Sequence, residues 1–577
     1  MKHSENNPTK RGEFPRTATA LMWLLPLLLI IPNAALDVTE GYSLGSRAAN
    51  VLLPGGFYLL VAAWGGRIGR KILFFAPLMV LCAFQIVLLF LYGEAIIAID
   101  MFLNVATTNV HEASELLANL GPAIAAVITL YLPLIGAGVW AEVRRARIPA
   151  EALVYGRRTA LGLIFLGVAA GAVAFGSSEG YRPGRELFPI NVLHNIIKAV
   201  ERSSATAAYP SVSAGYRFNA VDTDTVSNSP GKVIVVVIGE TSRADHWQLA
   251  GYKRPTTPRL SRRHDVRFYP KTLSESNTTH KSVPLMLSHL SASTFNDSVF
   301  YSGSIVDAFK EAGYMTAWLS NQAHNHSLID FYSQRADFAD YLCDEHPEDS
   351  PTRFDIELAS RLRDFIANQA SGRNLFVILH TYGSHFNYHE RYPATEAVFR
   401  PDNSAVASKE NKGNLVNAYD NSILATDKTL DSIIETLEAC GRPAAMAYAA
   451  DHGEDIFDDG RERFLHASPN PTYYQLHVPM LVWMSEGLAD RFPEKARSLK
   501  ANESKNVSSS ESMFHTVADL AGLSLPALDR SFSLCSPSYR EPLRLYLNDH
   551  NEGVALSRSG LRAEDLSMLK KNNISEK

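Results

Sequence analysis

Carboxylates and an imidazole follow two short, strand-like runs of this 577-residue chain. Glu240 comes directly after Val233–Gly239, and Asp451 and His452 come directly after Ala445–Ala450. Neighbouring parallel strands bring their carboxyl ends to one edge of a sheet, and carboxylates with an imidazole suit zinc. The pattern predicts a metal site, although Glu240 taken alone is more typical of a cap or an ion pair.

A stretch rich in hydroxyl residues, Ser274–Leu290, could supply a nucleophile. We expect a helix with Ser282 as N-cap and Pro284 in its first turn, so Thr278 and Thr279 would lie just before its positive end. That is a position that binds phosphoryl groups. Because a threonine hydroxyl is a poor nucleophile at neutral pH, the interpretation requires a metal that makes the alkoxide accessible. Without the metal, these residues are typical helix caps.

Two further histidines, His385 and His466, would be typical surface residues if the predicted metal site did not exist. His385 follows the strand-like run that ends near Leu379, and His466 lies in Phe-Leu-His-Ala. Residues alone therefore predict a metallohydrolase or a transferase and do not distinguish the two.

Strand-like runs alternate with longer amphipathic segments from Gly231 onward. This alternation predicts an α/β sandwich with a largely parallel central sheet. The expected strands are Val233–Ile238, Met315–Leu319, Leu375–Leu379, Ala445–Ala449 and Met480–Trp483. The expected helices include Ile305–Glu311, Asp355–Gln369, Leu415–Leu437 and Glu511–Leu520.

Apolar residues are concentrated in the first third of the chain. Windows free of Asp, Glu, Lys and Arg, each long enough to cross a bilayer, predict five transmembrane helices at 17–36, 48–66, 72–93, 117–141 and 159–178. The second window contains Pro54 and two glycines and is the weakest. We therefore expect an α-helical membrane domain at 1–178, a connector at 179–230 and a catalytic domain at 231–577. Within the connector we expect an amphipathic helix over Glu186–Arg202 and a loop over Ser203–Pro230.

Charges between the windows predict their orientation. Lys and Arg gather before the first window, between the second and third, and between the fourth and fifth, whereas the other connections are acidic. The positive-inside rule then gives a cytoplasmic N-terminus and places the C-terminal domain across the membrane, in the periplasm of a Gram-negative cell. The net charge of −5 and the lack of a long basic run give no reason to expect nucleic acid as a partner.

Several blocks together resemble the phosphoethanolamine transferases of the alkaline phosphatase/sulfatase superfamily, which decorate lipopolysaccharide and related envelope glycans. The blocks are Val-Ile-Gly-Glu-Thr-Ser-Arg-Ala-Asp-His at 237–246, the Thr279 segment ending in Ser-Val-Pro, His-Thr-Tyr-Gly-Ser-His at 380–385 and Asp-His-Gly-Glu at 451–454. Five spans followed by a periplasmic domain is also the architecture of this family.

The resemblance implies roles for individual positions. Glu240, Thr279, Asp451 and His452 would bind the catalytic zinc, and Thr279 would carry phosphoethanolamine as a covalent intermediate. His385 and His466 would hold the phosphoryl group or a second zinc, so the number of ions stays open. The family's residues for the donor headgroup correspond to a set that falls on one helical face, Asn104, Thr108 and Glu112.

The chain departs from the lipid A-modifying members of that family. Their cysteines beside the nucleophile correspond here to Glu275 and Leu285, and only Cys343, Cys440 and Cys535 lie in the soluble domain. Their substrate-contacting lysine has no clear counterpart in Asn321–His326. The chain therefore looks closer to cysteine-poor branches that modify the lipopolysaccharide core or periplasmic glucans.

The expected function is transfer of phosphoethanolamine from phosphatidylethanolamine to lipopolysaccharide, at lipid A or core, or to another envelope glycan. A monomeric, multi-pass inner-membrane protein is expected. One alternative is a glycerophosphate transferase like the lipoteichoic acid synthases, and another is a non-catalytic envelope protein that binds lipid. A sulfatase activity is disfavoured because no Cys-x-Pro-x-Arg segment is present.

Overall fold

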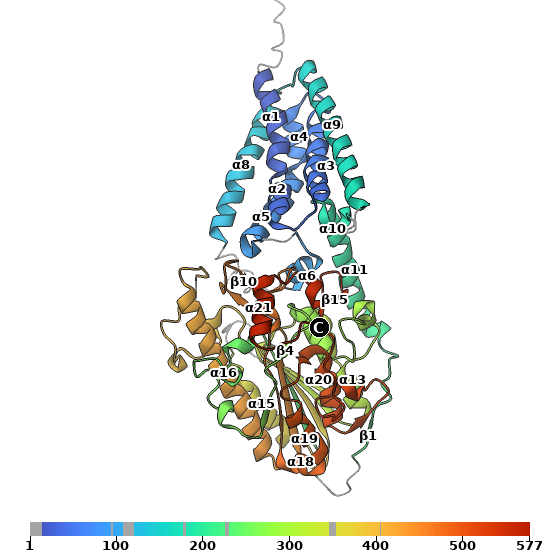
Figure 1. Cartoon of the computed structure of the whole chain (residues 1–577), viewed down its shortest axis with the longest axis vertical. Helices are drawn as coiled ribbons and strands as arrows, with labels where there is room; N and C mark the ends of the chain where they lie inside the picture. The colour runs from blue at the N-terminus through green and yellow to red at the C-terminus, as the bar shows by residue number, and fades with distance from the viewer. Residues whose placement is uncertain are drawn as a thin grey trace, which may run out of the picture. The chain divides into compact units, whose positions relative to one another are not determined.

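The computed structural model describes residues 14–93, 96–107, 120–176, 181–224, 230–344, 353–403 and 406–577. Contacts within the chain divide it into two units (Figure 1). The N-terminal unit comprises Met1–Phe102 and Leu116–Ala199, and the C-terminal unit comprises Leu103–Glu115 and Val200–Lys577.

The N-terminal unit is α-helical. In the described residues, three helical segments are long and apolar enough to cross a membrane: Pro15–Thr39, Gly121–Val143 and Ala150–Phe175. A pair of helices bent by 49°, Ile68–Phe74 and Ala76–Tyr92, would add a fourth as one broken span. The remaining predicted window, 48–66, overlaps α3, which does not meet the same criterion, and the count of five spans stays a prediction. The helices of this unit are α1 (Pro15–Leu29), α2 (Ile31–Thr39), α3 (Leu44–Ala62), α4 (Ile68–Phe74), α5 (Ala76–Tyr92), α8 (Gly121–Val143), α9 (Ala150–Phe175) and α10 (Pro183–Glu186).

Small residues allow α3 and α9 to pack closely. A Cβ atom on Gly167 of α9 would lie 2.8 Å from Cγ of Leu53 on α3, and one on Gly56 would lie 2.8 Å from Ile164. Such small-residue contacts are typical of helix pairs in membranes, where backbones approach without a hydrophobic driving force.

Helices α6 (Ile99–Thr107) and α11 (Ile190–Val212) each contain residues of both units. The amphipathic helix predicted in the connector corresponds to α11, but α11 continues ten residues past Arg202, into a segment expected to be a loop. Ala205, Ala207 and Ala208 favour the helix, and buried Tyr209 anchors it by donating a hydrogen bond to the Ser302 carbonyl at 2.9 Å.

The C-terminal unit is built on a seven-stranded sheet of order β3-β11-β8-β2-β7-β5-β6. Neighbouring strands from β8 to β6 are parallel, whereas β11 is antiparallel to both β8 and β3. The predicted largely parallel sheet is confirmed. Its strands are β2 (Val233–Gly239), β3 (Val266–Phe268), β5 (Met315–Ser320), β6 (Phe338–Tyr341), β7 (Leu375–His380), β8 (Ala444–Ala450) and β11 (Met480–Met484).

Both faces of this sheet are buried, as expected for parallel strands. Along β2, Ile234, Val236 and Ile238 enter the hydrophobic core on one face, and Val233, Val235 and Val237 enter the core on the other. The first core is shared with α12 (Thr279–Met286), α13 (Ile305–Glu311), α14 (Leu328–Ser333), α18 (Glu486–Arg491), α19 (Pro493–Ala501) and α20 (Ser509–Leu520). The second is shared with α15 (Glu357–Ala367) and α16 (Lys412–Ala439).

Short strand pairs hold the loops around the sheet. The parallel pair of β4 (Thr272–Leu273) and β12 (Val507–Ser508) supports the segment that leads to Thr279, and the hairpin of β9 (Asp455–Ile456) and β10 (Phe464–Leu465) leads to His466. The remaining elements are β1 (Val221–Asp222), β13 (Leu523–Ser524), β14 (Leu545–Leu547), β15 (Gly553–Ala555), α17 (Tyr473–Leu476) and α21 (Ala563–Lys571). No disulfide joins the four cysteines, all of which lie in the described residues.

Candidate functional site

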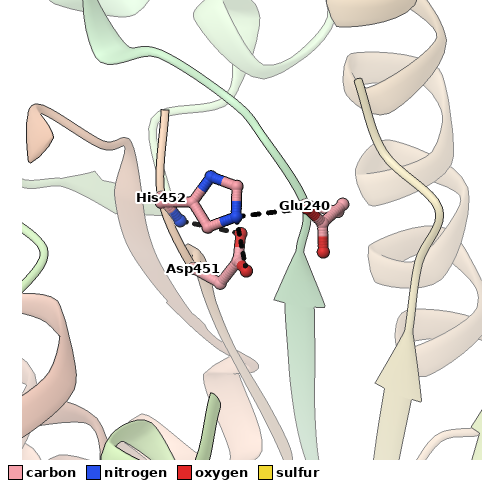
Figure 2. A group of neighbouring side chains, drawn as sticks. All are labelled: Glu240, Asp451 and His452. Carbon is pink, nitrogen blue, oxygen red and sulfur yellow. Dashed lines mark hydrogen bonds and ion pairs between the residues drawn. The ribbon is translucent and has the colours of Figure 1, made fainter. Parts of the chain in front are cut away.

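The ends of β2 and β8 bring Glu240, Asp451 and His452 together (Figure 2). Their ligand atoms lie within 4.8 Å of one another, and all three residues are buried. His452 Nε2 lies 3.4 Å from Glu240 Oε1 and 3.3 Å from Asp451 Oδ2. The two strands are adjacent and parallel, so the sheet itself positions the cluster.

The hydrogen bonds of His452 select the tautomer that a metal requires. Nδ1 lies 2.9 Å from the Gly453 carbonyl oxygen, which can only accept, so Nδ1 carries the proton. The lone pair of Nε2 therefore points toward the two carboxylates. Burial lowers the pKa of His452, but Asp451 and Glu240 outweigh burial and raise it above its ordinary value.

The two carboxylates have different surroundings. Burial acts to raise the pKa of Glu240, yet His452, His385 and His466 hold it below its ordinary value. Burial and then Glu240 raise the pKa of Asp451. Thr241, at a φ of 55° that is uncommon outside glycine, donates from Oγ1 to Glu240 Oε1 at 2.7 Å and from its backbone N–H to Asp451 Oδ1 at 3.2 Å. This strained residue thus joins the two carboxylates.

The hydroxyl of Thr279 lies against this cluster. Thr279 Oγ1 is 3.1 Å from His452 Nε2 and 3.4 Å from Glu240 Oε2. Thr279 is the first residue of α12, and its neighbour Thr278 is the N-cap. The predicted N-cap, Ser282, is wrong: extended Thr278 already begins the helix, and Ser282 Oγ donates to the Thr278 carbonyl at 2.9 Å inside it.

A polar cavity of about 160 Å³ opens onto Thr279. His385 and His466 line it, and so does Asn104, which groups with the C-terminal unit. The His466 ring lies 4.2 Å from the His452 ring and 5.9 Å from the His385 ring, measured between centroids. The other predicted headgroup residues, Thr108 and Glu112, lie outside the described residues.

A larger cavity, of about 850 Å³, lies beside Arg442 and Pro443, just before the start of β8. Asp451 follows the opposite end of that strand, and none of the predicted site residues lines this cavity.

The donor set fits a tetrahedral zinc ion. Zinc bonds of about 2.0–2.1 Å to nitrogen and oxygen place neighbouring donors about 3.3 Å apart. The contacts of His452 Nε2 with Thr279, Asp451 and Glu240 measure 3.1, 3.3 and 3.4 Å. Two carboxylates, a neutral imidazole and a hydroxyl are also ligand types that zinc accepts.

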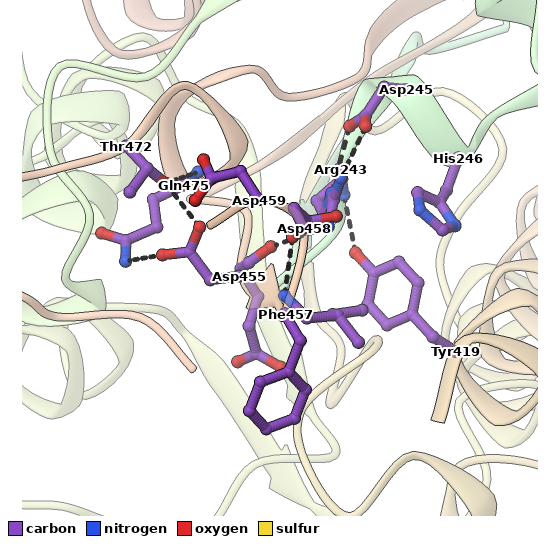
Figure 3. Close-up of polar contacts among 12 residues, drawn as sticks. Arg243, Asp245, His246, Tyr419, Asp455, Phe457, Asp458, Asp459, Thr472 and Gln475 are labelled. Carbon is purple, nitrogen blue, oxygen red and sulfur yellow. Dashed lines mark hydrogen bonds and ion pairs between the residues drawn. The ribbon is translucent and has the colours of Figure 1, made fainter. Parts of the chain in front are cut away.

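An arginine that sequence reasoning did not single out links the segments after β2 and β8 (Figure 3). Arg243 is 1% exposed in its side chain, pairs with Asp245 through two nitrogens and with Asp458 at 2.8 Å, and donates to the Glu454 carbonyl. Its position three residues after Glu240 and two residues before Asp245 was the available signal.

Glu454 is a second such residue. Its carboxylate accepts from the Tyr388 hydroxyl and lies 2.9 Å from Nδ1 of His466. Burial raises the pKa of Glu454 to about 7. A carboxylate on one ring nitrogen fixes the orientation of an imidazole. The block Asp451–Glu454 contained this residue, but its contact with His466 was not predictable because His466 arrives from a separate hairpin.

Comparison with known proteins places the chain in a family. The sequence model of the sulfatase family matches residues 232–523, which is half of the chain. The chain belongs to the sulfatase family. The matched range contains Glu240, Thr279, Asp451 and His452.

Relatives of this sulfatase-family chain include phosphatidylethanolamine transferase Mcr-1 of Escherichia coli, 29% identical over 310 residues that cover 51% of this chain and 56% of that protein. The chain thus spans just over half the length of such curated relatives. The integral membrane protein lipooligosaccharide phosphoethanolamine transferase A (EptA) of Neisseria meningitidis has a similar fold, with a TM-score of 0.69 at 22% identity over 91% of this chain and 99% of that one. The C-terminal periplasmic domain of EcEptC from Escherichia coli, solved in complex with Zn, has a TM-score of 0.52 at 24% identity, over 59% of this chain and 95% of that one. The predicted fold class, membrane helices with an alkaline phosphatase-like α/β domain, is confirmed.

Proposed function

We propose that this protein transfers phosphoethanolamine from phosphatidylethanolamine to lipopolysaccharide, at lipid A or core, or to another envelope glycan. The observation that carries the proposal is the contact of the Thr279 hydroxyl with His452 and Glu240 at the mouth of a polar cavity. The names of the curated relatives, which include phosphatidylethanolamine transferase Mcr-1, support the donor.

In this proposal Glu240, Thr279, Asp451 and His452 hold one zinc ion, and His385 and His466 hold the phosphoryl group or a second ion. Bound zinc would lower the pKa of the Thr279 hydroxyl and offset negative charge on the phosphoryl oxygens. The zinc complex of the EcEptC domain supports the identity of the metal.

The reaction proceeds in two steps. The Thr279 oxygen attacks phosphorus, the bond to the glycerol oxygen breaks, and diacylglycerol leaves with the proton. An oxygen of the acceptor then attacks the same phosphorus, the bond to Thr279 breaks, and the hydroxyl is restored. Glu454 orients the imidazole of His466 beside the reacting groups, and the positive end of α12 faces the phosphoryl charge.

The membrane part suits a lipid donor, because a tethered domain meets its substrate at the bilayer surface. The proposed topology has five spans, with the N-terminus in the cytoplasm and the C-terminal domain in the periplasm. Asn104, Thr108 and Glu112 would contact the donor headgroup, and the lining of the cavity by Asn104 supports this.

Donor identity is tested with the purified full-length chain and two lipids, phosphatidylethanolamine and phosphatidylglycerol, each labelled in the headgroup. Label should reach protein and acceptor from the ethanolamine lipid and not from the glycerol lipid. Release of diacylglycerol should stop in Thr279→Ala. Label from phosphatidylglycerol alone would identify a glycerophosphate transferase and reject the proposal.

A further inference from the structure

A glutamine from a third strand end lies against the metal cluster. Gln322 follows β5 by two residues, and its Nε2 lies 3.1 Å from Glu240 Oε2 and 3.1 Å from the Thr381 carbonyl oxygen. Both neighbours are acceptors, so the NH₂ end of the amide must face them. The two hydrogens of this group are thereby assigned, one to the carboxylate and one to the backbone after β7.

The backbone of Gln322 is fixed as well. Its N–H donates to Ser320 Oγ at 3.0 Å, and Ser320 Oγ donates to the Gln322 carbonyl at 2.9 Å. Ser320 is fully buried at the end of β5, and the next residue, Asn321, donates from its N–H to the His380 carbonyl at 2.8 Å. The amide therefore starts from a rigid base rather than from a free loop.

Glu240 consequently has a different donor on each oxygen. Thr241 Oγ1 donates to Oε1 at 2.7 Å, and Gln322 donates to Oε2. Oε1 is also the oxygen that faces His452 Nε2, at 3.4 Å. Two donors on opposite oxygens prevent rotation of the carboxylate about its terminal bond, so the carboxylate stays turned toward His452.

We propose that Gln322 is a positioning residue that holds Glu240 in the orientation in which it binds the metal. The proposal rests on the proposed zinc site and adds a residue outside the four ligands. Partners that hydrogen-bond to metal ligands commonly change metal affinity by about 10- to 100-fold. Gln322 also lines the cavity that opens onto Thr279, so a contact with substrate is the rival explanation.

Zinc affinity without substrate separates the two explanations. The full-length protein is purified in detergent, stripped of metal, and titrated with zinc in competition with a chromophoric chelator. Gln322→Met keeps the length of the side chain and removes the donor, and we expect it to weaken zinc binding about 10- to 100-fold. Gln334→Met, at the exposed end of α14, is the matched control and should bind zinc as the unchanged protein does.

A double-mutant cycle tests whether Gln322 acts through Glu240. In a Glu240→Ala background, Gln322→Met should cause no further loss of affinity, because the oxygen that it positions is gone. If Gln322→Met folds poorly, Gln322→Asn, which keeps an amide one methylene shorter, decides the matter by the same titration.

Unchanged zinc affinity in the Gln322 variants, or an equal loss with and without Glu240, would overturn the proposal. Headgroup transfer is measured separately on the same samples. If the unchanged protein binds no zinc, both the zinc site and the role of Gln322 are rejected. If it binds zinc and transfers the headgroup while the Gln322 variants bind equally well, the proposed function stands and only the role of Gln322 is rejected.

Discussion

Replacement of Arg243 by methionine should strongly destabilise the C-terminal unit. The guanidinium group is fully buried between Asp245 and Asp458 and joins the segments that follow β2 and β8. The guanidinium group also stabilises the ionised form of Asp245. Burial acts to raise the pKa of Asp245, but Arg243 holds this pKa well below its ordinary range. Arg243→Met leaves the side chains of Asp245 and Asp458, which are 21% and 14% exposed, without their buried cation, which costs at most about 3–5 kcal/mol.

The assay is urea unfolding of the full chain in detergent, followed by the fluorescence of the fully buried Trp247, Trp318 and Trp483. Arg243→Lys keeps the charge but not the two-nitrogen contact with Asp245, so it should cost about 1–3 kcal/mol. The triple variant Arg243→Met, Asp245→Asn, Asp458→Asn should recover most of the loss, because no unpaired charge stays buried. A loss below about 1 kcal/mol for Arg243→Met, or a triple variant no more stable than the single one, would refute the reasoning.

Further predictions concern pH, an orienting carboxylate and the metal. Burial lowers the pKa of His380 to about 4, below the value of about 6.5 in the unfolded chain. The free energy of unfolding that the neutral His380 side chain contributes is therefore complete above pH 6.5, and about 3 kcal/mol of it is lost as the pH falls to 4. His380→Asn should remove one proton from the pH dependence of unfolding in that window, and an unchanged slope would contradict this. Glu454→Gln should lower the rate of headgroup transfer about 10- to 100-fold while the protein stays folded, because the His466 ring loses its orienting charge; a rate equal to that of the unchanged protein would show that the contact is incidental. Zinc at 100 times its Kd should raise the unfolding free energy of chelator-treated protein by about 2.7 kcal/mol. Glu240→Gln should abolish most of that gain, and an equal gain with Mg²⁺ would argue against a zinc site.

The sheet and its strand ends were predictable because parallel strands leave a strong pattern. Val233–Gly239 and Ala444–Ala450 are continuous apolar runs, and a polar residue directly after each run had to reach the same edge. Thr279 carried no such pattern, and its assignment came from the resemblance of the whole segment to a known family. The structure brings its hydroxyl to the other three residues from a separate helix.

Other features depended on contacts that a single sequence does not display. Ser282 and Thr278 are both good caps, and only the backbone path determines that Thr278 begins α12. Gln322 was missed because strand ends were inspected for carboxylates and imidazoles, whereas an amide acts here through Glu240. The extent of α11 was underestimated because Ser203, Ser204 and Ser211 in its last turns are typical of loops, whereas the structure packs Tyr209 into the domain core.

Mass spectrometry of the Thr279 peptide tests the central claim most directly. The full-length protein is incubated with phosphatidylethanolamine without acceptor, quenched in acid and digested. We expect a phosphoethanolamine group on Thr279 that is absent from Thr279→Ala and that disappears when acceptor is added before quenching. An unmodified Thr279 peptide alongside released diacylglycerol, or modification of a different residue, would contradict the mechanism.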